Sequence, residues 1–145
     1  MIEVSPVLTF TGNCEAAFEY YRSVFGGEYQ FLYRYKDVEM DASNLPEGSG
    51  EKILHISLPL MKNVYLMGSD TLKEAKPDTA NHIVSIGLRL NNKEETFHLF
   101  EALAVGGRIL TPLGKVFYAD YFGSVVDRFG VCWTFNCNIG RESVV

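Results

Sequence analysis

Apolar and polar residues alternate along the chain with two different periods, and these periods predict the order of strands and helices. A period of two, typical of a half-buried strand, covers residues 3–10 and again residues 83–90. A period of three to four, typical of a helix with one buried side, follows each strand, over residues 13–25 and from Asn92 onward. Each half of the chain therefore begins with a strand and a helix.

The two predicted helices carry start and stop signals. Asn92 followed by Glu95 is a capping-box pattern, in which the first side chain accepts a hydrogen bond from the start of the helix. Both helices end at a glycine pair, Gly26-Gly27 and Gly106-Gly107, and glycine readily adopts the left-handed conformation that follows a helix. These signals give both helices defined ends.

Three more strands are predicted after each helix. The segments are residues 29–35, 53–60 and 63–69 in the first half, with a tight turn near Met61-Lys62, and residues 108–111, about 117–126 and 131–137 in the second. An acidic loop over residues 37–51 interrupts the first set. Each half is thus a βαβββ module, and the predicted fold class is α+β.

An alignment of the sequence with itself, shifted by 80 positions, indicates two equivalent modules. It gives six identities between residues 4–27 and 84–107 without a gap. We assign module one to residues 2–69, the linker to residues 70–81 and module two to residues 82–138. Because a module of about 65 residues buries too little surface by itself, we expect both modules to form a single domain over residues 1–145.

Composition and charge narrow the classes of function. The chain of 145 residues has 47% hydrophobic residues, 21% charged residues and a net charge of −5. These values fit a soluble globular domain, and the negative charge argues against nucleic acid as a partner. No apolar run reaches the ~18 residues of a membrane span, and no signal-peptide pattern follows Met1, so we expect a cytoplasmic protein without a membrane partner. No phosphate-binding glycine loop, serine nucleophile elbow or zinc-protease motif is present.

The three cysteines, Cys14, Cys132 and Cys137, indicate reduced and buried thiols. Their odd number does not suit a disulfide framework. Cys132 and Cys137 lie five residues apart in one predicted strand, so alternation sends them to opposite faces of the sheet. They are therefore a poor pair of metal ligands.

Two segments resemble the vicinal oxygen chelate superfamily, which includes glyoxalase I, bleomycin-resistance proteins and extradiol dioxygenases. Residues 12–27, with the sequence GNCEAAFEYYRSVFGG, and the run from Phe122-Gly123 to Asp127-Arg128-Phe129-Gly130-Val131-Cys132-Trp133 are similar to motifs of its PhnB-like branch. The resemblance covers nearly the whole chain. It implies two βαβββ modules whose curved mixed sheets surround a cavity, with the helices on the convex side.

The same resemblance implies where a metal site would lie. Members of the superfamily bind a divalent metal ion with one residue from the first strand and one from the last strand of each module. Carried over to this sequence, these positions are Ser5, Met67, Ser85 and Thr134. A hydroxyl is a weak ligand and a thioether suits soft copper, so we expect no metal ion and no other cofactor.

Alternation then divides each strand between the core and the cavity. The residues expected to line the cavity are Ser5, Thr9, His55, Ser57, Tyr65, Met67, Ser85, Arg89, Thr134 and Asn136. A polar lining is costly unless it meets water, a ligand or its own hydrogen bonds. We therefore expect either a pocket for a polar organic ligand or an inherited water-filled cleft.

Individual side chains in this set allow more than one role. His55 is the best candidate for a general base or a replacement metal ligand, and it equally fits a structural histidine bonded to a neighbouring strand. Arg89 fits either a clamp for a carboxylate or phosphonate, or a cross-strand salt bridge. The aromatic residues Phe117, Tyr118 and Tyr121 either wall the pocket or pack in the core.

Three hypotheses for the function follow. The leading one is a homodimer that binds a small polar molecule in a metal-free pocket. The second is a metal-dependent lyase, isomerase or dioxygenase with non-standard ligands, in which Asp120 or Glu51 would join His55. The third is a metal-free enzyme with His55 as the base and Arg89 stabilising an oxyanion. We do not expect a methyltransferase, because the sequence has no Rossmann-type glycine motif for S-adenosylmethionine.

Overall fold

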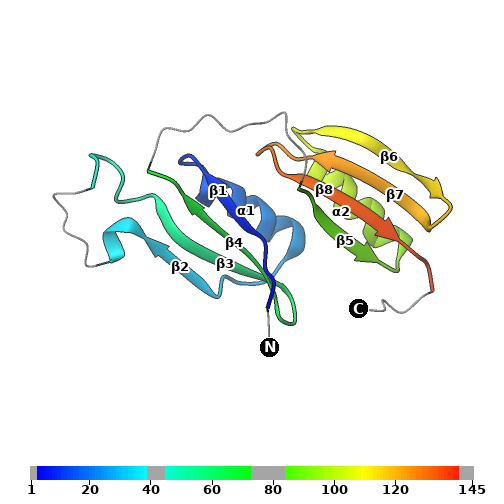
Figure 1. Ribbon diagram of the computed structural model, residues 1–145, viewed down its shortest axis with the longest axis horizontal. Coiled ribbons are helices and arrows are strands. Elements are labelled where there is room, and N and C mark those ends of the chain that lie inside the picture. Colours follow the sequence, from blue (N-terminus) through cyan, green and yellow to red (C-terminus); the bar gives the residue numbers. More distant parts are fainter. Residues whose placement is uncertain (1–2, 39–44, 73–83, 141–145) are drawn as a thin grey trace. The chain divides into compact units, whose positions relative to one another are not determined.

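The first half of the chain forms a four-stranded sheet with one long helix. The computed structural model describes residues 3–38, 45–72 and 84–140, and the chain divides into two compact units, Met1–Asp78 and Thr79–Val145. The elements of the first unit are β1 (Val7–Phe10), α1 (Cys14–Phe25), β2 (Phe31–Arg34), the 3-10 turn η1 (Tyr35–Asp37), β3 (Ile53–Met61) and β4 (Val64–Asp70). The strand order is β1-β4-β3-β2, with β1 parallel to β4 and the other pairs antiparallel (Figure 1).

The second unit has the same topology. Its elements are β5 (Ile86–Leu90), α2 (Lys93–Ala104), β6 (Arg108–Val116), β7 (Ala119–Val126) and β8 (Cys132–Cys137). The strand order is β5-β8-β7-β6, again with one parallel pair and two antiparallel pairs. The predicted α+β class with two βαβββ modules is therefore confirmed. In the described part of the chain, neither helix is long and apolar enough to cross a membrane.

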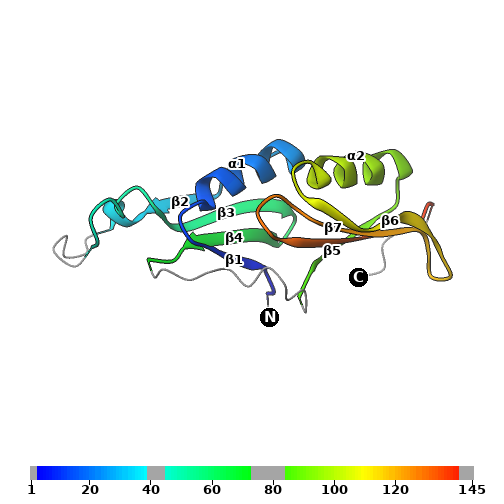
Figure 2. The ribbon, with the colours of Figure 1, turned by 90° about the horizontal axis from the view of Figure 1, so that it is seen from above.

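In each unit, one helix covers one face of the sheet (Figure 2). In the first unit, α1 packs closely over β4 at Gly68, where a methyl group would meet the Phe18 ring at 2.5 Å and the Cys14 sulfur at 3.2 Å. The residues next to Gly68 on this face, Ile56 and Leu66, are completely buried. Gly68 thus allows the Phe18 ring to lie directly on the sheet.

The second unit uses the same arrangement. Gly123 of β7 lies under the Phe100 ring of α2, and that ring makes an edge contact with Phe135 of β8 at 5.3 Å between ring centroids. The start of α2 is capped as the sequence predicts, because the Asn92 Oδ1 atom accepts a hydrogen bond of 2.8 Å from the Glu95 backbone N–H. Apolar contacts and a helix cap therefore fix α2 on its sheet.

Several strand ends differ from the sequence prediction. β1 begins at Val7 rather than at residue 3, and the preceding Pro6 has no N–H to donate to a ladder. β6 continues to Val116 through Pro112, because it is an edge strand with register shifts, where a missing N–H is tolerated. β3 runs to Met61, so the turn lies one residue later than predicted, with Asn63 in the left-handed conformation. The predicted linker beyond residue 72, the strand start at Ile83 and residues 39–44 of the acidic loop lie outside the described residues.

A buried carboxylate connects α1, β3 and β4. Asp70, at the end of β4, is 2% exposed. Its Oδ1 atom accepts hydrogen bonds from the backbone N–H groups of Gly12 and Cys14, and its Oδ2 atom accepts one from Ile53, all at 2.9–3.0 Å. The Tyr35 hydroxyl donates to the Asp70 carbonyl oxygen at 2.8 Å. A carboxylate at the start of a helix is also stabilised by the helix dipole.

The second unit has a buried carboxylate at the turn before β8. The Oδ1 atom of Asp127 accepts hydrogen bonds from the Phe129 and Val131 backbone N–H groups, and its Oδ2 atom accepts one from the Trp133 indole at 2.9 Å. Asp127 is 3% exposed and Trp133 is completely buried. The carboxylate therefore satisfies an indole N–H that would otherwise be buried without a partner.

We predict that Asp70→Asn destabilises the protein by about 2–4 kcal/mol, because charge-assisted hydrogen bonds are lost and an amide N–H group replaces one acceptor oxygen. Asp37→Asn is the matched control, since the Asp37 carboxylate accepts a backbone hydrogen bond from Arg34 at an exposed site. The control should cost less than about 1 kcal/mol. Urea unfolding measures both values, and equal losses in the two variants would contradict the role of Asp70.

The three cysteine thiols are free and buried, as predicted. Cys14 and Cys137 have no exposed surface, and Cys132 is 7% exposed. Burial, with Asp70 nearby, raises the pKa of the Cys14 thiol well above its ordinary value, and burial likewise raises the pKa of Cys132. The thiolate, which is the nucleophilic form, is therefore scarce at neutral pH.

We predict that the native thiols react with Ellman's reagent at pH 8 at least about 100-fold more slowly than in guanidinium chloride, because burial blocks both access and ionisation. The variant Lys62→Cys, in the exposed turn after β3, is the positive control and should react at the rate of an unfolded thiol. A native cysteine that reacts as fast as the one at position 62 would show that its strand is open.

Candidate functional site

The face of the first sheet opposite α1 carries one row of polar side chains across all four strands. Tyr33 of β2 pairs with His55 of β3, and Thr9 of β1 pairs with Ser69 of β4. In the antiparallel pair of β3 and β4, Ile56 lies opposite Gly68. The next residues along the two strands, His55 and Ser69, therefore also lie opposite each other. The strand pairing thus brings together Tyr33, His55, Ser69 and Thr9, which are far apart in the sequence.

A second row on the same face is mainly apolar. Phe31 pairs with Ser57, Ser57 with Met67, and Met67 with Val7. Ser57 is completely buried, and its hydroxyl lies 3.3 Å from Gln30 Oε1. It is therefore a structural hydroxyl that a ligand does not reach directly. Met67 is half-buried beside it.

His55 is a polar side chain of this face that has no hydrogen-bond partner among the described residues. It is half-buried, and no hydrogen bond or ion pair joins its imidazole to the described residues. No nitrogen or oxygen of a described side chain is both fully buried and unpaired. Among residues 3–38, 45–72 and 84–140, the donor and the acceptor of the His55 imidazole therefore have no hydrogen-bond partner.

The remaining predicted residues of the first unit lie beside these rows. Ser5 precedes β1 and is half-buried, and Tyr65 of β4 is half-buried next to Pro59. Thr9 is exposed. The predicted residues that lie in strands of the first unit, Thr9, His55, Ser57, Tyr65 and Met67, fall on the face opposite α1 according to strand alternation and register.

In the second unit, the face opposite α2 is also polar. Gly87 pairs with Thr134 and Thr134 with Ser124. Arg89 pairs with Asn136, whose Oδ1 atom accepts a hydrogen bond of 2.8 Å from the Asn138 amide. Arg89 and Ser85 are exposed, and Thr134 and Asn136 are half-buried. This face therefore offers a guanidinium group beside an amide and two hydroxyls.

The sequence prediction did not include several side chains on these faces, among them Phe31, Tyr33, Ser69, Phe122 and Ser124. For β2, alternation alone leaves the choice of face open, because Phe31 and Tyr33 are aromatic while the intervening Leu32 is also apolar. The pairing of Tyr33 with His55 decides it. Ser69 could have been predicted from the sequence, because it follows Met67 by two positions in a predicted strand and so shares its face.

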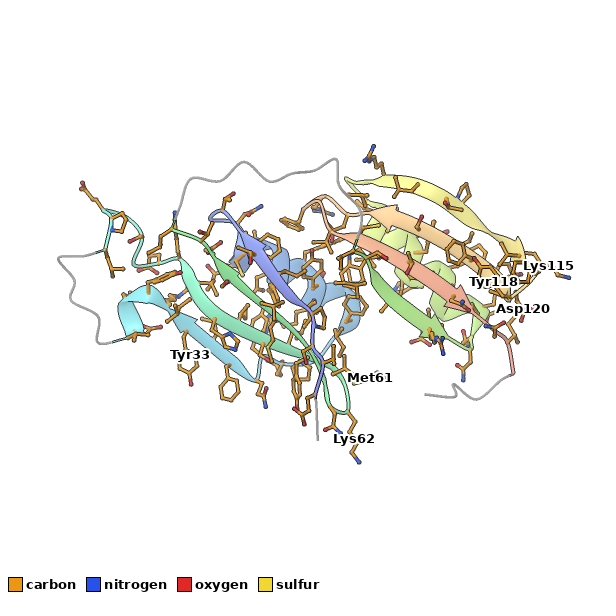
Figure 3. All side chains as sticks on the ribbon, in the orientation of Figure 1. Tyr33, Met61, Lys62, Lys115, Tyr118 and Asp120 are labelled. Carbon is orange, nitrogen blue, oxygen red and sulfur yellow. The ribbon has the colours of Figure 1, made fainter. Side chains whose placement is uncertain are left out.

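The predicted aromatic wall separates into two groups. Tyr121 packs on the helix side, where its ring centroid lies 5.2 Å from that of Phe97 of α2. Tyr118 instead contacts Phe122 on the opposite face, at 5.7 Å. Phe117 is 99% exposed in the β6–β7 turn. Figure 3 shows Tyr118 near Lys115 and Asp120 at this end of the second sheet.

The donor set on these faces does not fit a divalent metal ion. The four positions carried over from the superfamily are Ser5, Met67, Ser85 and Thr134, which supply hydroxyls and a thioether. Within residues 3–38, 45–72 and 84–140, no group of three His, Cys, Asp or Glu side chains is arranged to hold a metal.

The two carboxylates considered as substitute ligands are occupied by other contacts. Asp120 Oδ2 accepts a hydrogen bond of 2.9 Å from the Ile139 backbone N–H. Glu51 forms ion pairs with Lys36 and Arg34, and its hydrogen bond with Lys36 lowers the pKa of the Glu51 carboxyl. Both carboxylates therefore make contacts within their own unit.

Comparison with known proteins agrees with the fold and the motifs. A family model described as 3-demethylubiquinone-9 3-methyltransferase matches residues 2–135. Protein YjdN of Escherichia coli (strain K12) is 32% identical over 143 residues, covering 92% of this chain and 93% of that protein.

Two solved structures extend the likeness to three dimensions. Protein PA1353 from Pseudomonas aeruginosa has a TM-score of 0.82 and 36% identity, covering 96% of this chain and 99% of that one. A putative 3-demethylubiquinone-9 3-methyltransferase, PhnB protein, from Bacillus cereus has a TM-score of 0.76 and 25% identity, covering 94% and 99%. The family model over residues 2–135 and these relatives together show that the chain belongs to the 3-demethylubiquinone-9 3-methyltransferase family, and its paired βαβββ units have the fold of the vicinal oxygen chelate superfamily, whose PhnB-like branch its two motifs resemble.

Proposed function

We propose that this protein binds a small polar organic molecule on the open faces of its sheets, without a metal ion. The observation that carries the proposal is the half-buried His55 imidazole, which no described residue hydrogen-bonds. A half-buried polar group without a partner loses part of its hydration on folding and regains a hydrogen bond when a ligand binds. The neighbouring Tyr33, Ser69 and Thr9 add further polar contacts.

The second sheet supports the same function. Arg89 and Asn136 form a cross-strand pair, with Thr134 and Ser124 one row away. The Arg89 guanidinium has five N–H donors, so it can bind a carboxylate or phosphonate oxygen in addition to its interaction within the protein. We therefore include Ser85, Arg89, Thr134 and Asn136 in the proposed ligand-binding set.

A metal-dependent lyase, isomerase or dioxygenase is not favoured by the donors described above. The description of the family model names a methyltransferase, but the sequence has no glycine motif of the kind that binds S-adenosylmethionine in Rossmann-type enzymes. The proposed activity is therefore binding, with neither metal nor methyl donor as a cofactor.

We also propose that the protein is a cytoplasmic homodimer. Two apolar side chains on or before the first strand of the first unit are largely exposed, namely Val4 at 81% and Val7 at 62%. Exposed apolar residues that gather on one surface commonly mark protein interfaces. Analytical ultracentrifugation at micromolar concentration tests this assembly, with a single species of one-chain mass as the contradicting result.

The binding proposal predicts that His55→Ala weakens the binding of polar fragments about fivefold, because the loss of one hydrogen bond costs about 1 kcal/mol. His98→Ala is the matched control, since His98 is an exposed residue of α2. The measurement is an amide NMR titration of EDTA-treated protein with hits from a library of polar fragments.

Thermal melts with added Mn²⁺, Ni²⁺, Zn²⁺ and Fe²⁺ test the metal-free state in protein from which the EDTA has been removed, and the metal content is measured before the EDTA treatment. We expect the same melting temperature with and without each ion. A rise that disappears in His55→Ala, together with stoichiometric metal in the purified protein, would favour the metal-dependent enzyme instead.

A further inference from the structure

Two parallel aromatic rings lie exposed on the edge strand of the first sheet. Phe31 and Tyr33 of β2 are 44% and 46% exposed. Their ring centroids are 6.0 Å apart, and the ring planes differ by only 18°. Residues two apart in a strand share one face, so both rings stand on the side opposite α1. Figure 3 shows Tyr33 extending from β2 at the edge of the sheet.

The described strand residues of the face beside these rings include no acidic side chain, lysine or arginine. Its other members in the described strands are Val7, Thr9, His55, Ser57, Pro59, Tyr65, Met67 and Ser69, none of them acidic, lysine or arginine. The nearest arginine of β2, Arg34, is turned toward α1, where it forms an ion pair with Glu15. A charged ligand group would therefore be desolvated here without an opposite charge.

Hydrogen-bonding groups lie within one ring width of the aromatic pair. His55 is the direct cross-strand partner of Tyr33, and side chains in that relation stand about 5 Å apart. A flat ring stacked on Tyr33 would thus point one edge at the His55 imidazole, with the Ser69 hydroxyl one strand further on. The apolar row beside it, with Met67 and Val7, suits the rest of the ring system.

We propose that the open face of the first sheet binds an uncharged, planar aromatic group, which stacks on Tyr33 and Phe31 and hydrogen-bonds through one edge to His55. This inference rests on the proposed binding function and names the class of molecule that this face recognises. Aromatic stacking selects flat rings by geometry, the missing charges select neutral molecules, and His55 selects rings with a polar edge.

The test uses three probes that differ in one property each. 2-Quinolone is flat and neutral, with an N–H and a C=O on one edge. Its octahydro analogue keeps that polar edge but is not flat, and 2-hydroxyquinoline-4-carboxylate is flat but charged. Amide NMR titrations of the 145-residue chain give the dissociation constant of each probe, and the shifted amides locate the site.

We expect 2-quinolone to bind at least about tenfold more tightly than either of the other probes, with shifts in β2 and β3. Tyr33→Leu should weaken it about threefold to tenfold, which is the contribution of one aromatic pair. Phe117→Leu is the matched control, because Phe117 is an exposed aromatic residue of the other unit, and it should leave the affinity unchanged.

The two proposals fail in different ways. If the saturated or the charged probe binds at this face as tightly as 2-quinolone, or if Tyr33→Leu has no effect, the aromatic preference is wrong while small-molecule binding stands. If no probe or polar fragment shifts the amides of either open sheet face, the proposed function itself is wrong, and this inference falls with it.

Discussion

Each four-stranded sheet has a single helix, and that helix covers only one of its two faces. Every strand therefore has to serve two environments with alternate residues. On the helix side, Ile56, Leu58 and Leu66 are completely buried, and each contributes about 1.5–3 kcal/mol by leaving water. On the other side, the intervening positions of the same strands include His55, Ser57 and Met67. The opposite face can carry polar residues because the stabilising apolar contacts lie on the helix side of the sheet.

This division depends on the register between β3 and β4, and Asp70 helps to fix that register. One oxygen of its carboxylate binds the start of α1, and the other binds the first residue of β3. The helix α1 and the strand β3 are therefore tied to the last residue of β4. A slip of one residue in β3 would send His55 to the helix side and Ile56 to solvent. The position of the imidazole is thus linked to a buried carboxylate far from it in the sequence.

Much of this architecture was predictable from residue patterns. The alternation in β3 and β8 is regular enough to separate core from open face, and Asn92 with Glu95 correctly marks the start of α2. A predicted strand end was wrong where the backbone preference of a residue and its position in the sheet oppose each other. Pro112 reads as a strand break, yet it lies in an edge strand that needs no N–H at that position.

The parts of the site that sequence could not supply come from pairing between distant segments. β2 has apolar residues on both sides, so only its partner strand shows that Tyr33 faces the same way as His55. Asp70 and Asp127 read as polar residues at strand ends, whereas both are buried acceptors of backbone N–H groups. The residue pattern of one sequence does not show which distant backbone N–H groups will donate hydrogen bonds to a carboxylate.

The proposed ligand binding requires that the face opposite α1 is open to small molecules. Paramagnetic relaxation by a neutral gadolinium chelate, measured on aromatic side-chain protons, tests this most directly. We predict strong enhancement for the ring protons of Tyr33 and His55 and none for the buried rings of Phe18 and Trp133. If the His55 ring is as protected as Trp133, the face is closed and the account is contradicted.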